Sequence, residues 1–208
     1  MAVPILYFGI QLLAAPFFPG YSFLRCDAST LGSDGSSFPL IFNVGAIIQG
    51  GVTLIAAWGF VHAFRLLGVN AILTWLTSLA VIVCGLASMN AGVFPLPDRR
   101  HTEGLLALVG IGMLLLPALL PAALWKLPDS RRLKVYFIVN LIAFVALIPI
   151  MSGLIQRMNI MMGVDIPGYQ SFLNNCQGLL QRIVALIVIG PIGVASWALA
   201  RYRNDSTA

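Results

Sequence analysis

The chain has 208 residues, of which 59% are hydrophobic and only 9% are charged. A soluble domain carries about 25% charged residues, so this composition excludes a soluble globular enzyme, a nucleic-acid-binding protein and a disordered chain. The 12 basic residues, which give a net charge of +5, are scattered among apolar stretches. We therefore interpret them as determinants of membrane topology. The sequence predicts a polytopic membrane protein whose immediate partners are membrane lipids, with no nucleic-acid partner.

Apolar stretches of membrane-spanning length recur along the whole chain. A transmembrane helix needs about 20 predominantly apolar residues, and no repeat or linker divides the chain. We expect an all-α fold, a single polytopic membrane helix bundle over residues 1–208. Its six predicted transmembrane helices cover residues 3–18, 39–64, 71–94, 105–125, 135–156 and 178–200.

The first of these stretches, residues 3–18, is short, and a cleaved signal peptide is the alternative interpretation. No Lys or Arg precedes the apolar residues, and Pro16 to Gly20 is more typical of a helix end than of a cleavage site. We therefore count this stretch among the predicted helices.

The distribution of Lys and Arg between alternate loops predicts the orientation. Seven basic residues fall on the side that holds both termini and five on the opposite side, and the densest cluster lies between Lys126 and Lys134. This balance predicts that both termini are cytoplasmic and that the protein is a multi-pass protein of the cell inner (plasma) membrane.

Small residues recur along the predicted helices, for example Gly45 with Gly50, Gly85 with Ala87, and Gly190 with Gly193. Such residues let helix backbones approach closely. Packing within one bundle is the simpler interpretation, and a homo-oligomer formed through these helix faces is the alternative.

Polar side chains gather toward the predicted outer face, in the longer connecting segments and the adjoining helix ends. If the protein has a binding site, we expect it to open there. The predicted ligand-binding residues are Asn43, Asn90, Arg99, Arg100, Gln181 and Arg182.

Arg182 is the most informative of these residues because a charge inside a membrane helix is costly and usually finds a partner. The candidate partners are the acidic residues of the outer segments, namely Asp34, Asp98, Glu103 and Asp165. The alternative is that Arg182 extends from a shallow depth to the interface. For Asn43 and Asn90 the alternative to ligand binding is a hydrogen bond between helices, which is the more common role of such residues.

His101 precedes Glu103 by two residues, so its imidazole could act as a general base oriented by a carboxylate. If the protein is an enzyme, His101, Asp34 and Glu103 are the candidate catalytic residues. The other histidine, His62, belongs near the opposite end of its helix, and no metal-binding pattern is present. The sequence therefore predicts no metal and no cofactor.

Two of the three cysteines, Cys26 and Cys176, fall on the predicted outer side, where oxidation is possible. A disulfide between them is one interpretation, and two free thiols is the other. Cys84 falls in the middle of a predicted helix and is typical of a small packing residue.

Short motifs spread from about Gly20 to Trp197 resemble those of a known membrane family. They are Gly20 to Ser22, Ser29 to Gly32, Phe42-Asn43 followed by Gly45 and Gly50, Gly92 to Pro95 followed by His101, Gly178 to Ile183, and Trp197. In this order and spacing the chain resembles the multi-pass integral membrane family catalogued as domain of unknown function 998.

The resemblance implies a bundle of about six membrane spans with no assigned reaction. Family members often carry an acidic residue at the position of Gln181. This chain therefore has Gln181-Arg182 where a Glu-Arg pair is common, which argues against proton transfer by this pair.

Three functions are compatible with these features. The first is an integral membrane protein with a polar, outward-opening site that binds a lipid or another amphipathic small molecule. The alternatives are an intramembrane enzyme acting on a lipid or isoprenoid substrate and a small transporter. The small size, the absence of a repeat and the lack of charge in the middle of any predicted helix argue against the transporter.

Overall fold

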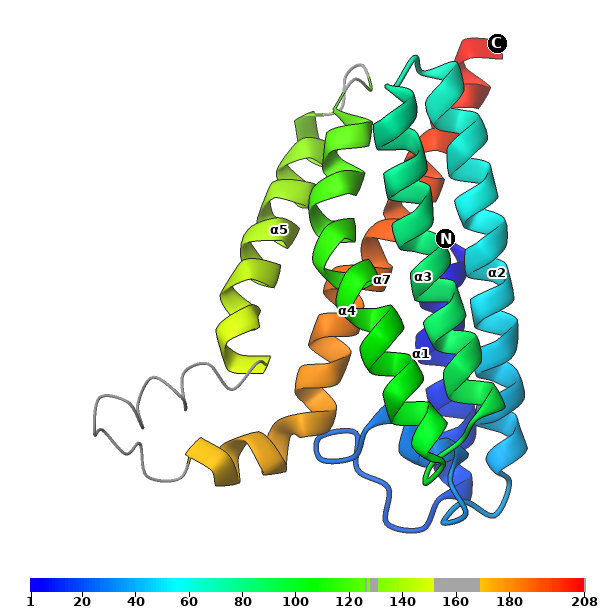
Figure 1. The fold of residues 1–208 in the computed structure, drawn as a ribbon, viewed down its shortest axis with the longest axis vertical. Helices are drawn as coiled ribbons and strands as arrows, with labels where there is room; N and C mark the ends of the chain where they lie inside the picture. Colours follow the sequence, from blue (N-terminus) through cyan, green and yellow to red (C-terminus); the bar gives the residue numbers. More distant parts are fainter. Residues whose placement is uncertain (126, 128–130, 152–168, 208) are drawn as a thin grey trace.

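The computed structural model describes residues 1–125, 127, 131–151 and 169–207, and in these residues all regular structure is helical (Figure 1). The helices are α1 (Ala2–Ala14), α2 (Pro39–Leu66), α3 (Ala71–Val93), α4 (Arg99–Leu124), α5 (Arg131–Met151) and α7 (Tyr169–Thr207), with short 3-10 turns η1 (Ala15–Phe17) and η2 (Ala28–Gly32).

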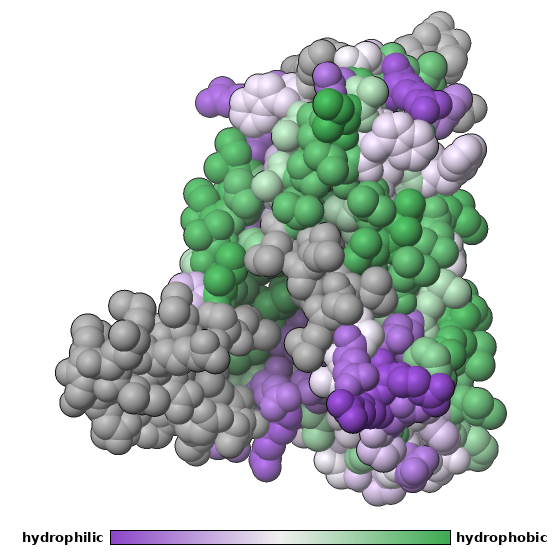
Figure 2. Space-filling view, viewed as in Figure 1, coloured by the Kyte–Doolittle hydropathy of each residue, from purple (hydrophilic) through white to green (hydrophobic). Residues whose placement is uncertain are grey.

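Within the described residues, four helices are long and apolar enough to cross a membrane. They are Pro39–Leu66, Ala71–Val93, Arg131–Ile150 and Asn175–Tyr202. A space-filling view shows hydrophobic residues over the middle of the molecule and hydrophilic residues toward both ends (Figure 2). The expected all-helical, membrane-type architecture is confirmed, and these four helices match the predicted spans 39–64, 71–94, 135–156 and 178–200, although residues 152–156 lie outside the described part of the chain.

Two helices begin earlier than the sequence predicted. α4 starts at Arg99 instead of residue 105 because Asp98 caps it, its side chain accepting a hydrogen bond from the Arg100 backbone N–H. α7 starts at Tyr169 instead of residue 178. Polar residues that were expected in connecting segments therefore lie in first helical turns.

The first helix is the main departure from the predicted spans. α1 and η1 together cover only Ala2–Phe17, and α1 itself ends at Ala14 instead of residue 18, because the 3-10 turn η1, which contains Pro16, follows it. At 1.5 Å per residue, α1 reaches about 20 Å, which is shorter than the hydrocarbon core of about 30 Å. Figure 1 accordingly shows the N-terminus at mid-height, far from the end where α2 meets α3.

α1 packs between α2 and α7 in the half of the bundle that it reaches. On one side Ile10 lies over Gly45 of α2, where a Cβ would come within 2.6 Å of the isoleucine side chain. On the other side Pro4 lies over Gly193 of α7, where a Cβ on the glycine would lie 2.6 Å from the proline Cγ. Both glycines let the flanking helices approach α1, so α1 fills the space between them.

The closest helix pair is α2 with α3, which cross at two glycines. A Cβ on Gly50 would lie 2.5 Å from the Gly85 carbonyl oxygen and 2.4 Å from Met89 Cγ. The turn between these helices uses Gly68 in the left-handed conformation, with φ +65°. These contacts hold α2 and α3 as an antiparallel pair.

The two ends of the bundle differ in charge. We name the end where α2 meets α3 the basic end, because the described charged side chains there are Arg65, Arg131, Arg132, Lys134 and Arg201. We name the opposite end, which holds the segment from Phe18 to Phe38 and the start of α4, the loop end. The described acidic side chains all lie at the loop end, and they are Asp27, Asp34, Asp98 and Glu103.

The α2–α3 crossing gives a direct test of this packing. Gly50→Ala should destabilise the protein by about 1–3 kcal/mol because its Cβ meets backbone atoms that cannot rotate away. Gly51→Ala is the matched control, since nothing lies within 4 Å of its Cβ and alanine favours a helix. Thermal unfolding in detergent should show a lower midpoint for Gly50→Ala only. Equal midpoints would contradict the crossing.

Candidate functional site

Arg182 of α7 binds the backbone of the first loop. Its Nη1 donates to three carbonyl oxygens, those of Phe23 at 2.9 Å, Cys26 at 3.0 Å and Gly178 at 2.7 Å. Its Nη2 donates to the Tyr21 hydroxyl. None of the acidic residues Asp34, Asp98 and Glu103 pairs with Arg182, and Asp165 lies outside the described residues. The partners of this charge are thus carbonyl dipoles and a phenol.

Tyr21 links Arg182 to the next part of the same loop. Its hydroxyl accepts the hydrogen bond from Arg182 and donates to the Asp27 carbonyl oxygen at 3.1 Å. Burial raises the pKa of Tyr21, and the Arg182 charge only partly offsets this effect. The phenol therefore stays protonated near neutral pH, as its role as a donor requires. The guanidinium also lies 4.9 Å from the Phe23 ring centroid.

The third and fourth turns of α7 make three more hydrogen bonds to the first loop. Gln181 Oε1 accepts from the Ala28 N–H at 2.7 Å, and Gln177 Nε2 donates to Asp27 Oδ2 at 2.7 Å. The Leu179 N–H donates to the Leu24 carbonyl oxygen at 3.0 Å. Glycine is required at position 178, because a Cβ there would lie 2.4 Å from the Cys26 carbonyl oxygen. We name these contacts, together with those of Arg182, the α7 clasp.

Asn43 and Asn90 bind backbone in the same way. Asn43 Nδ2 donates to the Gly32 carbonyl oxygen at 3.1 Å, and Asn90 Nδ2 donates to the Arg100 and His101 carbonyl oxygens at 3.3 and 3.2 Å. In a bilayer, unpaired backbone groups cost several kcal/mol. These amides and the α7 clasp satisfy such groups where the chain leaves its helices.

His101 is hydrogen-bonded to the backbone and not to the other two candidate catalytic residues. Its side chain is buried, and Nδ1 lies 2.8 Å from the Phe94 carbonyl oxygen, so Nδ1 carries the ring proton because a carbonyl can only accept. Glu103 is exposed and pairs with Arg99 at 2.6 Å. Asp34 is exposed. Among described residues, His101 makes no hydrogen bond to either carboxylate.

Arg100, predicted as a ligand-binding residue, pairs with Asp98 at 2.7 Å and lies 4.3 Å from the Phe94 ring centroid. Its hydrogen bonds to the Asp98 carboxylate hold the pKa of that group below its usual value. Arg99 and Arg100 thus both pair with acidic residues of their own helix end.

Cys26 and Cys176 are free thiols in this structure, as is Cys84. Within the described residues, no group of three His, Cys, Asp or Glu side chains could hold a metal ion.

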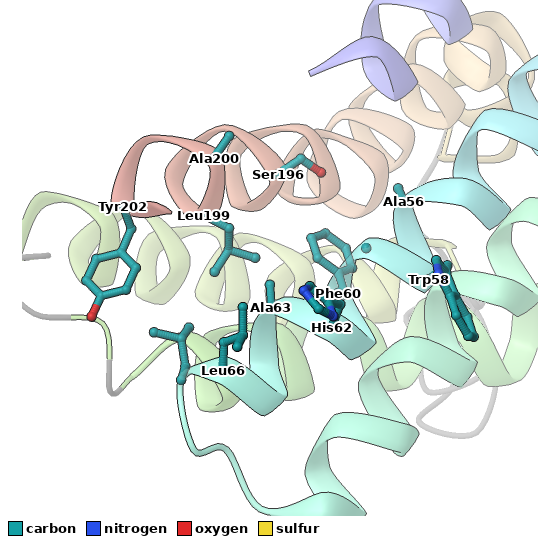
Figure 3. Close-up of a pocket in the computed structure, with 12 residues that line it drawn as sticks. Ala56, Trp58, Phe60, His62, Ala63, Leu66, Ser196, Leu199, Ala200 and Tyr202 are labelled. Carbon is teal, nitrogen blue, oxygen red and sulfur yellow. The ribbon is translucent and has the colours of Figure 1, made fainter. Parts of the chain in front are cut away.

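A cavity lies at the basic end, away from the predicted ligands. We name it the α2–α7 groove, and its volume is about 670 Å³. It runs between Ala56, Phe60 and Leu66 of α2 and Ser196, Leu199 and Tyr202 of α7 (Figure 3). Phe60 and Leu199 are buried at its floor, whereas Leu66 and Tyr202 are exposed at its rim.

The length of α1 explains this groove. Its first turn lies beside Gly193, and Ser196 at the inner end of the groove follows one helical turn later on α7. Beyond that level, α1 no longer separates α2 from α7. The groove therefore continues the space that α1 fills in the other half of the bundle.

Residues 1–198 match the family model described as Protein of unknown function (DUF998). The chain belongs to this family. The match confirms the resemblance inferred from the motifs between Gly20 and Trp197. No curated protein and no solved structure matches the chain.

Sequence analysis missed both the groove and the partners of Arg182. The groove had one signal, the shortness of the first apolar stretch, which ends before a membrane thickness is covered. The partners of Arg182 are mainly backbone carbonyls, and a sequence pattern carries no signal for such partners.

The α7 clasp can be tested by replacing the guanidinium group of Arg182 with the single ammonium group of a lysine. Arg182→Lys cannot reach three carbonyls and a phenol with one ammonium group, and each hydrogen bond to a charged group contributes about 1.5–3 kcal/mol. We expect faster amide hydrogen exchange over residues 21–28 and a loss of about 2 kcal/mol in the free energy of unfolding. Arg99→Lys, at an exposed position, is the control. Unchanged exchange in Arg182→Lys would rule out the clasp.

Proposed function

We propose that this protein is a lipid-binding membrane protein that holds the apolar chain of one amphipathic molecule in the α2–α7 groove. The observation that carries the proposal is the groove itself, which is mostly apolar and has a volume of about 670 Å³. Ligand sites typically measure about 300–1,000 Å³ and combine apolar walls with a few polar groups. Here the polar groups are His62, Ser196 and Tyr202.

The proposed ligand class is the one expected from the sequence, but the proposed site lies at the basic end and not at the loop end. The expected ligand-binding residues Asn43, Gln181 and Arg182 bind the backbone of their own chain. A headgroup at the loop end would have to displace those hydrogen bonds. At the basic end, the apolar chain of a ligand packs over Phe60 and Leu199 and displaces none of these hydrogen bonds.

We also propose a topology and a location. The basic end faces the cytoplasm because the described side chains there are cationic and those at the loop end include every described carboxylate. All six helices are embedded in the plasma membrane, α1 as a helix that crosses about half of it. Both termini then point toward the cytoplasmic side, and the groove lies in the cytoplasmic leaflet.

The groove can be filled by one substitution. Gly59 lines it and has nothing within 4 Å of its Cβ, so Gly59→Trp should occupy the groove without distorting α2. Native mass spectrometry of gently solubilised protein should show a bound lipid for the wild type and its loss in Gly59→Trp. Gly51→Trp is the matched control, because Gly51 is equally open on the same helix but lies outside the groove. Lipid retained equally by all three proteins would refute the proposal.

Cysteine accessibility tests the orientation. On a background without native cysteines, Ser37→Cys at the loop end and Tyr202→Cys at the basic end both introduce exposed thiols. In intact spheroplasts, a membrane-impermeant maleimide should label Ser37→Cys. Tyr202→Cys should react only after the spheroplasts are lysed. The reverse pattern would invert the proposed topology without affecting the groove.

A further inference from the structure

We infer that α7 has a hinge at Gly190-Pro191 and that Asn140 of α5 holds this hinge in place, so that Asn140 controls how fast a lipid enters and leaves the α2–α7 groove. The inference rests on the proposed function and describes the regulation of the same site. Three features carry it, namely the backbone hydrogen bond that α7 lacks, the donor that Asn140 supplies, and the position of the groove beyond the hinge.

Pro191 interrupts the backbone hydrogen bonds of α7. Proline has no N–H, so the carbonyl oxygen of Ile187, four residues earlier, lacks its usual partner within the helix. Gly190 precedes the proline, and the nearest atom that a Cβ there would meet is the Tyr136 hydroxyl oxygen at 3.6 Å, an ordinary contact. Packing therefore does not require this glycine. A Gly-Pro pair makes the turn easier to bend than a turn of other residues.

Asn140 replaces the missing donor. Its Nδ2 donates to the Ile187 carbonyl oxygen at 2.7 Å. A helix carbonyl without a donor is costly inside a bilayer, so without Asn140 the turn would have to change shape to find another partner for Ile187. Tyr136, one turn before Asn140 on α5, lies beside Gly190 of the same turn. α5 thus supports α7 at the point where its own hydrogen bonding is incomplete.

The groove lies beyond this turn and on the side of α7 that faces away from α5. Ser196, Leu199 and Tyr202, which line the groove, all follow Pro191 (Figure 3). Ser196 comes nine residues after Ile187, which is about two and a half turns at 3.6 residues per turn and points the side chain to the opposite side of the helix. A bend of α7 toward or away from α5 therefore changes the width of the groove.

The surroundings of the hinge are fixed. The glycine crossing holds α2 against α3, and the α7 clasp holds the part of α7 before the hinge to the first loop. Gly193 packs against Pro4 of α1, but it lies only two residues after Pro191 and moves little when α7 bends there. The part of the wall that moves is the segment of α7 from Ser196 onward.

A distance measurement tests the hinge. The full-length protein without native cysteines carries spin labels at Ile72→Cys on α3 and Arg201→Cys on α7, two exposed positions, in nanodiscs of phosphatidylglycerol and phosphatidylcholine. Pulsed electron paramagnetic resonance should give a narrow distance distribution for this protein and a broader one after Asn140→Leu. Adding Pro191→Ala should narrow the distribution again, because the alanine N–H binds the Ile187 carbonyl oxygen within α7.

Lipid exchange tests the effect on the groove. The protein is loaded with chain-deuterated lipid from vesicles of equal parts phosphatidylglycerol and phosphatidylcholine, unlabelled vesicles are added in excess, and native mass spectrometry follows the loss of deuterated lipid. Exchange should be about threefold to tenfold faster in Asn140→Leu, as expected for the loss of one hydrogen bond between membrane helices. The variant Asn140→Leu/Pro191→Ala should exchange at the wild-type rate.

Two further variants complete the design. Gly190→Ala stiffens the turn without a steric clash, so it should slow lipid exchange while leaving Asn140 in place, and it tests the hinge even if Asn140→Leu fails to fold. Ser88→Ala is the control, because its hydroxyl donates to a carbonyl oxygen of its own helix at 3.2 Å. It should change neither the distances nor the exchange rate.

The outcomes separate the hinge from the proposed function. Wild-type distances and wild-type exchange in Asn140→Leu would overturn the inference, and so would effects of Asn140→Leu that persist when Pro191→Ala is added. If Gly59→Trp loses no lipid, the groove is not the site and the proposed function fails. The distance distributions still report on the hinge in that case, since they are measured without reference to a bound lipid.

Discussion

The packing of α1 between α2 and α7 determines where this bundle is closed and where it is open. Pro4 against Gly193 and Ile10 against Gly45 bring backbone and side chains into contact over the half of the bundle that α1 reaches. Beyond the first turn of α1 the same two helices continue without α1 between them, and the α2–α7 groove is the space left there. A helix that is shorter than a hydrocarbon core thus leaves a groove between its two neighbours.

The loop end is held together by hydrogen bonds to the backbone. Arg182 donates to three carbonyl oxygens, and Gln181, Asn43 and Asn90 each bind a backbone group at the end of a helix or in the first loop. This use of polar side chains follows from the low dielectric constant of the surroundings, in which an irregular segment must find partners for its N–H and C=O groups inside the protein. It also explains why these side chains gather at one end of the bundle.

The two ends therefore have different roles in the proposed mechanism. The polar side chains of the loop end bind the backbone of their own chain, whereas the basic end contains the α2–α7 groove, whose walls are mostly apolar. The difference in charge between the two ends is, by the positive-inside rule, the basis of the topology that we propose.

The sequence by itself determined the membrane-type helical architecture, the family and the approximate bounds of α2 and α3, because each depends on local composition or on short motifs. It could not determine the partner of Arg182, since carbonyl acceptors leave no mark in a residue pattern, nor the burial of His101 away from Glu103 and Asp34. Only the tertiary structure decided where the cavity lies, because a groove between α2 and α7 depends on how far a third helix extends between them.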